Sequence, residues 1–136
     1  MSTTFSKEEK AAMRATAAER KAAQAGADLE AACLTAISEM TGTDKELAET
    51  LHRLVTSHTS LRAKTWYGMP AYTNLDGKVV VFFQSAAKFK VRYATIGFQQ
   101  DANLDDGDFW PTSYAVTKLT AVEEERLVAL LTKAVS

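Results

Sequence analysis

The hydrophobic pattern of this chain changes its period twice, and that change restricts the fold more than any other feature. Up to about residue 57, apolar side chains recur every three or four positions, as they do on one face of an amphipathic helix. From about residue 70 they alternate or run unbroken, as in strands, and after residue 120 the helical period returns. Helices, then a block of strands, then a last helix predict an α+β fold.

The N-terminal region is expected to form two helices. The first, at about 7–24, follows a Ser6–Glu9 capping pair and is rich in alanine, with Met13 as its only large apolar side chain. Such a helix has high propensity but little to bury, so we expect it on the surface. Gly26 is predicted to end this helix, and Asp28 to cap the next.

Capping signals mark the start of two more helices. Thr43 with Glu46 predicts a third helix that continues to about residue 57 and packs antiparallel to the second. Thr120 with Glu123 predicts the last helix, which carries a stripe of leucines.

Four strands are expected between these helices. Residues 70–72 begin the sheet, a turn at 74–77 leads to a central strand at 78–84, and a short strand is expected at 113–119. Residues 88–98 alternate and predict a half-exposed antiparallel strand. Its apolar face is expected to hold Phe89, Val91 and Tyr93, and its polar face Lys88, Lys90 and Arg92. The whole predicts helices packed on one face of a small antiparallel sheet.

Size and composition indicate one domain. The chain has 136 residues, of which 46% are hydrophobic and 24% charged, as in an ordinary globular protein. We assign residues 1–136 to a single domain, with a helical extension at 5–40 and a core at 43–136. The net charge of -1 gives no electrostatic case for nucleic acid or an acidic membrane. One cysteine, no apolar run of about 18 residues and no secretory signal favour a cytoplasmic protein.

No set of residues amounts to a catalytic site, so a role other than catalysis is favoured. Cys33 lies on an apolar helical stripe, where a thiol is usually inert. His52 and His58 are six residues apart and do not share a helical face. The loop after residue 100 resembles a calcium loop but lacks the required glycine and glutamate positions. It keeps four aspartates as weak candidates for a metal: Asp101, Asp105, Asp106 and Asp108.

Aromatic residues are concentrated between residues 66 and 110. The phenylalanines are expected in the core, whereas tryptophan and tyrosine carry polar tips suited to the rim of a pocket. A ligand pocket is therefore expected from Trp66, Tyr67, Met69, Tyr72, Tyr93 and Trp110. Gly68 is expected to need a positive φ or a close backbone approach, in a hinge between helix and sheet.

The segment "YGMPAY" followed by the hairpin "GKVVVFFQSAAKFKVRYATIGF" resembles the YdhG-like family of small bacterial proteins. The resemblance covers about residues 45–135 and rests on residues 67–71 and the "GKVV" hairpin. It implies a frataxin-like two-layer sandwich, and some members of that family are described as iron chaperones. Iron is therefore a cargo that the resemblance implies.

Two classes of function stay open at this point. The first is a cytoplasmic carrier for iron or for a small ligand in the aromatic pocket. The second is a structural or interaction module whose aromatic residues are only core. In that case a basic stripe on the first helix would dock a protein partner through Lys7, Lys10, Arg14 and Lys21.

Overall fold

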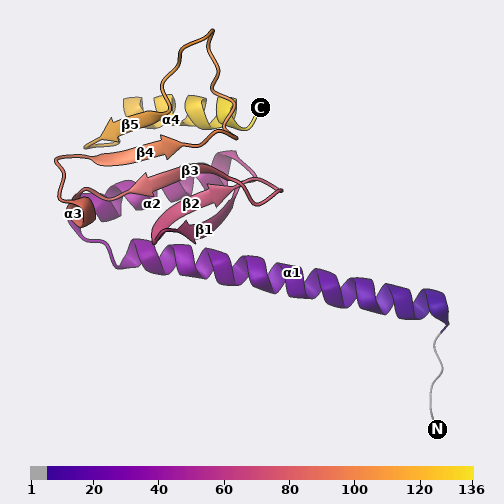
Figure 1. Cartoon of the computed structure of the whole chain (residues 1–136). Helices are drawn as coiled ribbons and strands as arrows, with labels where there is room; N and C mark the ends of the chain where they lie inside the picture. Colours follow the sequence, from indigo (N-terminus) through magenta and orange to yellow (C-terminus); the bar gives the residue numbers. More distant parts are fainter. Residues whose placement is uncertain (1–5) are drawn as a thin grey trace.

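The computed structural model describes residues 6–136 and shows an α+β fold (Figure 1). Within these residues four helices and five strands follow one another along the chain. Their order is α1 (Lys7–Ser38), α2 (Gly42–His58), β1 (Arg62–Trp66), β2 (Met69–Thr73), β3 (Val79–Gln84), α3 (Ala86–Phe89), β4 (Ala94–Phe98), β5 (Ser113–Val116) and α4 (Ala121–Ala134).

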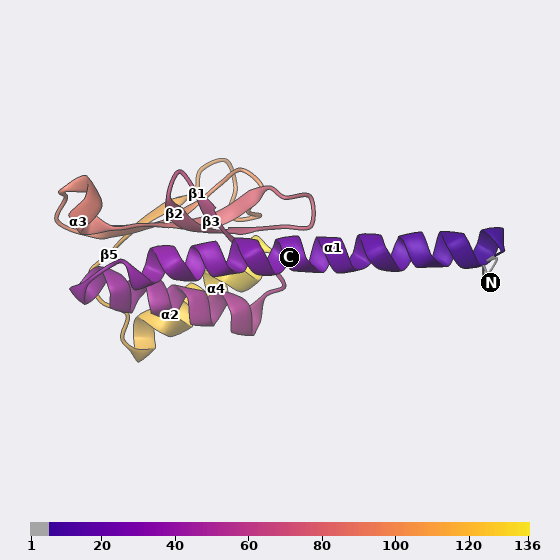
Figure 2. The ribbon, with the colours of Figure 1, turned by 90° about the horizontal axis from the view of Figure 1, so that it is seen from below.

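The five strands form one antiparallel sheet in sequence order, β1-β2-β3-β4-β5. Helices α1, α2 and α4 cover one face of it, and no helix among the described residues covers the other (Figure 2). The core lies between the two layers and is built from apolar residues of both, including Leu51, Val55, Tyr72, Phe83, Ile96 and Leu131. The α+β class with an N-terminal helix is therefore confirmed.

Helix α1 is continuous over 32 residues, so the predicted break at Gly26 is wrong. A glycine inside a helix costs only about 1 kcal/mol, and the alanines around it restore helix propensity. The buried residues of α1 are Cys33 and Ile37, both near its C-terminal end. Its N-terminal half extends away from the body of the molecule (Figure 1). Residue 5, the first of the predicted extension, lies outside the described residues.

Helix caps agree with the sequence at both ends of the chain and differ at α2. Ser6 caps α1 as predicted, because its side chain accepts a hydrogen bond from the N–H of Glu9 at 3.1 Å. Thr120 and Glu123 form the predicted reciprocal capping box at the start of α4. Helix α2 instead begins at Gly42, with Thr41 as an N-cap whose side chain makes no capping bond. The predicted Thr43–Glu46 cap is therefore wrong. Gly42 has a φ of +57°, which lets the chain turn sharply between α1 and α2.

Strand β1 is absent from the sequence prediction, and it changes the role of Gly68. Trp66 of β1 pairs with Met69 of β2, so Tyr67 and Gly68 form a two-residue hairpin turn. Both have a positive φ, as a type I′ turn requires. Gly68 thus has the predicted positive φ, but the predicted hinge between helix and sheet is wrong because a strand precedes the turn.

Residues 88–93 do not form the predicted half-exposed strand. Ser85 caps the single turn α3, and Asp44 of α2 accepts hydrogen bonds from the N–H groups of Ala86 and Ala87 at 2.9 and 3.0 Å. These acceptors satisfy the free N–H groups of a helical start, so the chain turns before β4 begins at Ala94. Phe89, Val91 and Tyr93 consequently lie exposed, not on a core face.

Candidate functional site

The structure brings only part of the predicted aromatic pocket together. Trp66 contacts Tyr67 with ring centroids 5.0 Å apart, and Phe82 with centroids 5.4 Å apart. Met69 pairs with Trp66 across the hairpin and so shares its face of the sheet. This is the face that the helices leave uncovered, since Tyr72, three residues after Met69, points to the helices.

The other predicted pocket residues lie in separate environments. Tyr72 is fully buried, and its hydroxyl lies 3.0 Å from Nδ1 of His52 in α2. Tyr93 precedes β4, where its ring lies 5.3 Å from the guanidinium of Arg92. Trp110 lies in the loop between β4 and β5 and packs partly against the core. The six residues therefore do not surround one common cavity.

The four candidate aspartates lie on the exposed loop between β4 and β5. Within residues 6–136, no group of three or more His, Cys, Asp or Glu side chains is arranged to hold a metal ion.

A polar network crosses the core at the helix face of β2. Glu30 lies 4.0 Å from Nε2 of His52, His52 contacts Tyr72, and Tyr72 neighbours Cys33. Burial raises the pKa of the Cys33 thiol and of the Tyr72 hydroxyl, and burial lowers the pKa of His52 against the opposing effect of Glu30. A thiol held in its protonated form is a poor nucleophile. The network therefore links side chains of α1, α2 and β2.

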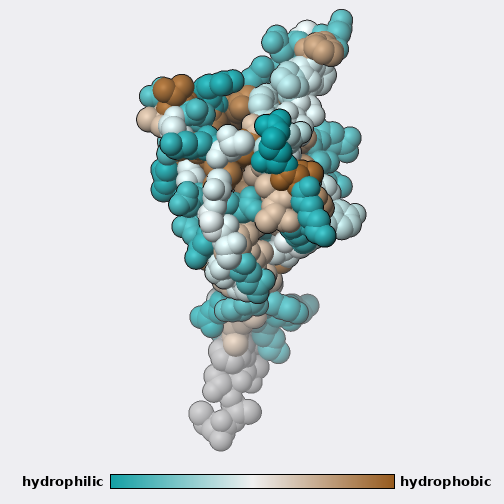
Figure 3. Space-filling view, turned by 90° about the vertical axis from the view of Figure 1, so that its left-hand side faces the viewer, coloured by the Kyte–Doolittle hydropathy of each residue, from teal (hydrophilic) through white to brown (hydrophobic). Residues whose placement is uncertain are grey.

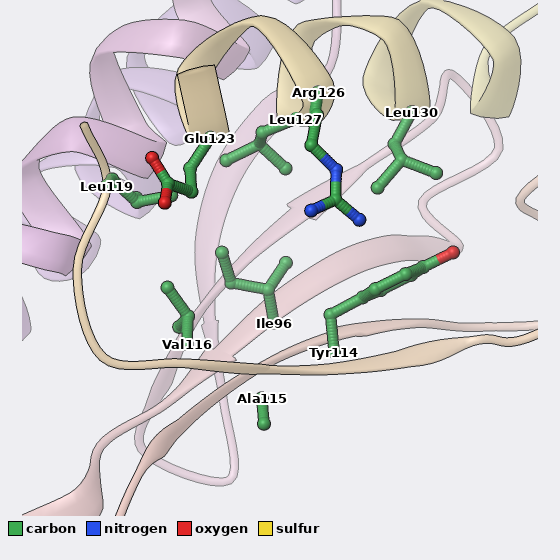
Figure 4. A pocket seen from close by; sticks show the side chains of 9 residues that line it. All are labelled: Ile96, Tyr114, Ala115, Val116, Leu119, Glu123, Arg126, Leu127 and Leu130. Carbon is green, nitrogen blue, oxygen red and sulfur yellow. The ribbon is translucent and has the colours of Figure 1, made fainter. Parts of the chain in front are cut away.

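A pocket of about 110 Å³ lies between α4 and the strands β4 and β5 (Figure 4). Its apolar wall consists of Ile96, Tyr114, Val116, Leu119, Leu127 and Leu130. Tyr114 is held in place by Phe98, whose ring meets it edge-on at 6.0 Å. Two charged residues of α4, Glu123 and Arg126, complete the lining.

The two charged residues play different parts in this pocket. The carboxylate of Glu123 accepts bonds from the N–H and hydroxyl of Thr120, so the helix cap engages it. Arg126 reaches from α4 toward Tyr114 and Ile96, beneath the helix (Figure 4). Among residues 6–136, Arg126 takes part in no ion pair. The pocket thus combines an apolar wall with one cation that has no charged partner in the described chain.

Part of the signal for this site lies in the sequence around Arg126. Arg126 stands directly beside Leu127, on the edge of the leucine stripe of α4. A cation at the edge of an apolar stripe lies where its stem can pack and its head can reach a ligand. The sequence does not show that Tyr114, twelve positions earlier, shares a pocket with Arg126. The connection between β5 and α4 places the two residues opposite each other.

No family model, curated protein or solved structure matches this chain in the three comparisons. The fold and pocket define the class: an α+β protein with a small apolar pocket beside an edge strand. Membership in the YdhG-like family therefore stays a prediction. No helix in residues 6–136 is long and apolar enough to cross a membrane.

Proposed function

We propose that this chain is a binding protein for a small amphipathic carboxylate, held in the pocket between α4 and β5. The observation that carries the proposal is the unpartnered Arg126 guanidinium beside an apolar wall. Arginine presents a planar fork of donors that matches both oxygens of a carboxylate. A ligand with an acidic head and a short hydrocarbon tail satisfies both parts of the pocket.

The pocket size sets the expected affinity. Each buried methylene contributes about 0.8 kcal/mol, and an exposed ion pair at most about 1 kcal/mol. A tail with about four buried methylenes therefore gives a dissociation constant no tighter than roughly 1 mM. Weak, readily reversible binding suits a carrier or a sensor of an abundant metabolite, not a tightly held cofactor.

Titration with octanoate, followed by ligand-observed saturation-transfer NMR, tests the proposal. Arg126→Gln should weaken octanoate binding by about fivefold, since it removes an ion pair of about 1 kcal/mol. The control Arg20→Gln removes a cation from the exposed N-terminal half of α1 and should leave the affinity unchanged. Octan-1-ol, which has no charge, should bind wild type and Arg126→Gln equally. Equal octanoate affinity in wild type and Arg126→Gln would rule out this use of the pocket.

The iron-carrier function implied by the YdhG-like resemblance is a separate prediction. It draws no support from a ligand cluster in residues 6–136. Calorimetric titration with ferrous iron tests it, with Asp101, Asp105, Asp106 and Asp108 changed to asparagine as the comparison. A cytoplasmic location likewise stays a prediction.

A further inference from the structure

Residues 88–93 form an exposed patch that alternates cations with apolar side chains, here called the basic face. Phe89, Val91 and Tyr93 are 44%, 47% and 37% exposed. Lys88, Lys90 and Arg92 lie between them, and none of the three takes part in an ion pair within residues 6–136. The left-handed Lys90, with a φ of +53°, ends α3 and leaves this segment uncovered. Figure 3 looks at this end of the molecule, where hydrophobic side chains lie among hydrophilic ones.

A hollow of about 500 Å³ adjoins the basic face. Its lining includes Leu47, Val91, Arg92, Tyr93 and Val116, from α2, the basic face and β5. The one carboxylate in the lining, Asp44, already accepts two backbone N–H groups. The lining holds one cation, Arg92, whose guanidinium lies 5.3 Å from the centre of the Tyr93 ring. The hollow therefore offers an apolar wall beside the cations of the basic face, and it fits a partner with an apolar group flanked by negative charge.

The chain itself carries such a group on the loop between β4 and β5. Phe109 is 92% exposed, the highest value among the exposed large apolar residues of the described chain. Asp105, Asp106 and Asp108 flank it, and none of them takes part in an ion pair within residues 6–136. This loop, here called the acidic loop (105–110), stands away from the body of the molecule (Figure 1). Three carboxylates and a phenyl ring thus face solvent together.

The two surfaces lie at opposite ends of the β4–β5 hairpin. Ala94 pairs with Val116 at the end beside the basic face. At the other end Gly97 pairs with Ser113, and the Phe98 N–H bonds the Thr112 carbonyl just before the acidic loop. Because the paired strands β4 and β5 separate the two surfaces, the loop does not reach the hollow of its own chain. A second copy of the chain is free of this restriction.

We propose that the acidic loop of one copy docks on the basic face of another, with Phe109 in the hollow. The carboxylates then approach Arg92, which lines the hollow, and the other cations of the basic face, and an exposed phenyl ring loses its contact with water. The contact joins two different surfaces, so repeated association gives a ring or an open chain of copies. One loop on one hollow makes a small interface, so the association is weak and falls with added salt. The inference is independent of the pocket between α4 and β5.

Analytical ultracentrifugation of the full chain over a concentration series tests this proposal. At low salt the weight-average mass of the wild type should rise with concentration, and high salt should reverse the rise. Phe109→Ala should reduce the association. Absence of any rise for the wild type at low salt would overturn the proposal.

Charge reversal makes the test specific to the two surfaces. Lys88→Glu/Lys90→Glu/Arg92→Glu reverses the basic face, and Asp105→Lys/Asp106→Lys/Asp108→Lys reverses the acidic loop. Each variant alone should remain monomeric, whereas an equimolar mixture should associate because every contact again joins opposite charges. The control Arg20→Glu/Lys78→Glu/Lys133→Glu changes the same amount of charge at exposed positions outside both surfaces and should associate like the wild type. Melting curves verify that each variant is folded. A mixture that stays monomeric, or loss of association in this control, would contradict the proposal.

Discussion

Tyr67 and Gly68 form the tip of the β1–β2 hairpin, with φ values of +51° and +78°. A left-handed conformation is unfavourable for any residue with a Cβ, and especially for a bulky aromatic one. Tyr67 is nonetheless 81% exposed, so burial of its side chain does not offset this conformational cost. The turn is held by the strand pairing on either side and by the contact between Tyr67 and Trp66. Gly68 limits the steric cost of the turn, because glycine has no Cβ.

Gly68→Ala should lower the free energy of unfolding by about 1–2 kcal/mol, the cost of a left-handed residue with a Cβ. The added Cβ would also stand 2.9 Å from Nζ of Lys88, a flexible group that can move aside. Gly26→Ala is the matched control, because Gly26 is helical and nothing lies within 4 Å of its added Cβ. It should raise stability by up to about 1 kcal/mol. Urea unfolding measures both, and equal effects of the two changes would contradict the turn geometry.

His52 should make the fold sensitive to mild acid. Burial lowers its pKa in the folded state, with Glu30 opposing and with the neutral Tyr72 hydroxyl and Cys33 thiol nearby. As the pH falls, the unfolded chain therefore binds a proton at His52 before the folded chain does. The stability that neutral His52 contributes is complete above the unfolded pKa of about 6.5 and is lost as the pH drops below it. Urea unfolding between neutral and mildly acidic pH should show this loss in wild type and a smaller loss in His52→Gln. The control is His58→Gln, at the exposed end of α2, which should show the same loss of stability as the wild type. An equal loss in wild type and His52→Gln would show that groups other than His52 cause it.

At the scale of elements, the sequence predicts those helices and strands that a local pattern of residues determines. Strand β3 and helix α4 follow from an apolar run and from a capping box, both of which are local. Residues 88–93 alternate like a strand but turn through α3, because Asp44 supplies acceptors from 42 and 43 positions away. The contact with Asp44 cannot be inferred from the residue pattern of 88–93. The break expected at Gly26 fails for the opposite reason: a run of alanines outweighs one glycine.

Helix α1 divides into a docked end and a free end, which gives a sharp test. Residues 7–25 are exposed throughout, whereas Ile37 is 4% exposed. Deleting residues 1–24 should change the free energy of unfolding by no more than about 0.5 kcal/mol, as for exposed sites. Ile37→Ala should cost about 2–5 kcal/mol, as buried Ile-to-Ala changes do. A loss of several kcal/mol on truncation, measured by urea unfolding, would show that the free end packs on the body.

At the scale of the whole molecule, helices cover one face of the sheet, and no helix formed by residues 6–136 covers the other (Figure 2). The sequence predicts this two-layer arrangement but assigns the ligand site to the aromatic residues around Trp66. The pocket between α4 and β5 depends on how α4 lies across two strands, and packing between layers sets that geometry. Residue patterns identify Arg126 and Tyr114 separately. Only the assembled layers bring them to the same pocket.

Chemical-shift mapping with octanoate on the isotopically labelled chain tests the central claim most directly. The account predicts that the largest amide and methyl shifts fall on Tyr114, Leu119, Leu127 and Leu130, with the Arg126 side chain among them. Those shifts should shrink in Arg126→Gln at the same octanoate concentration. Shifts that gather instead on Trp66, Tyr67 and Phe82, on the other face of the sheet, would contradict the account.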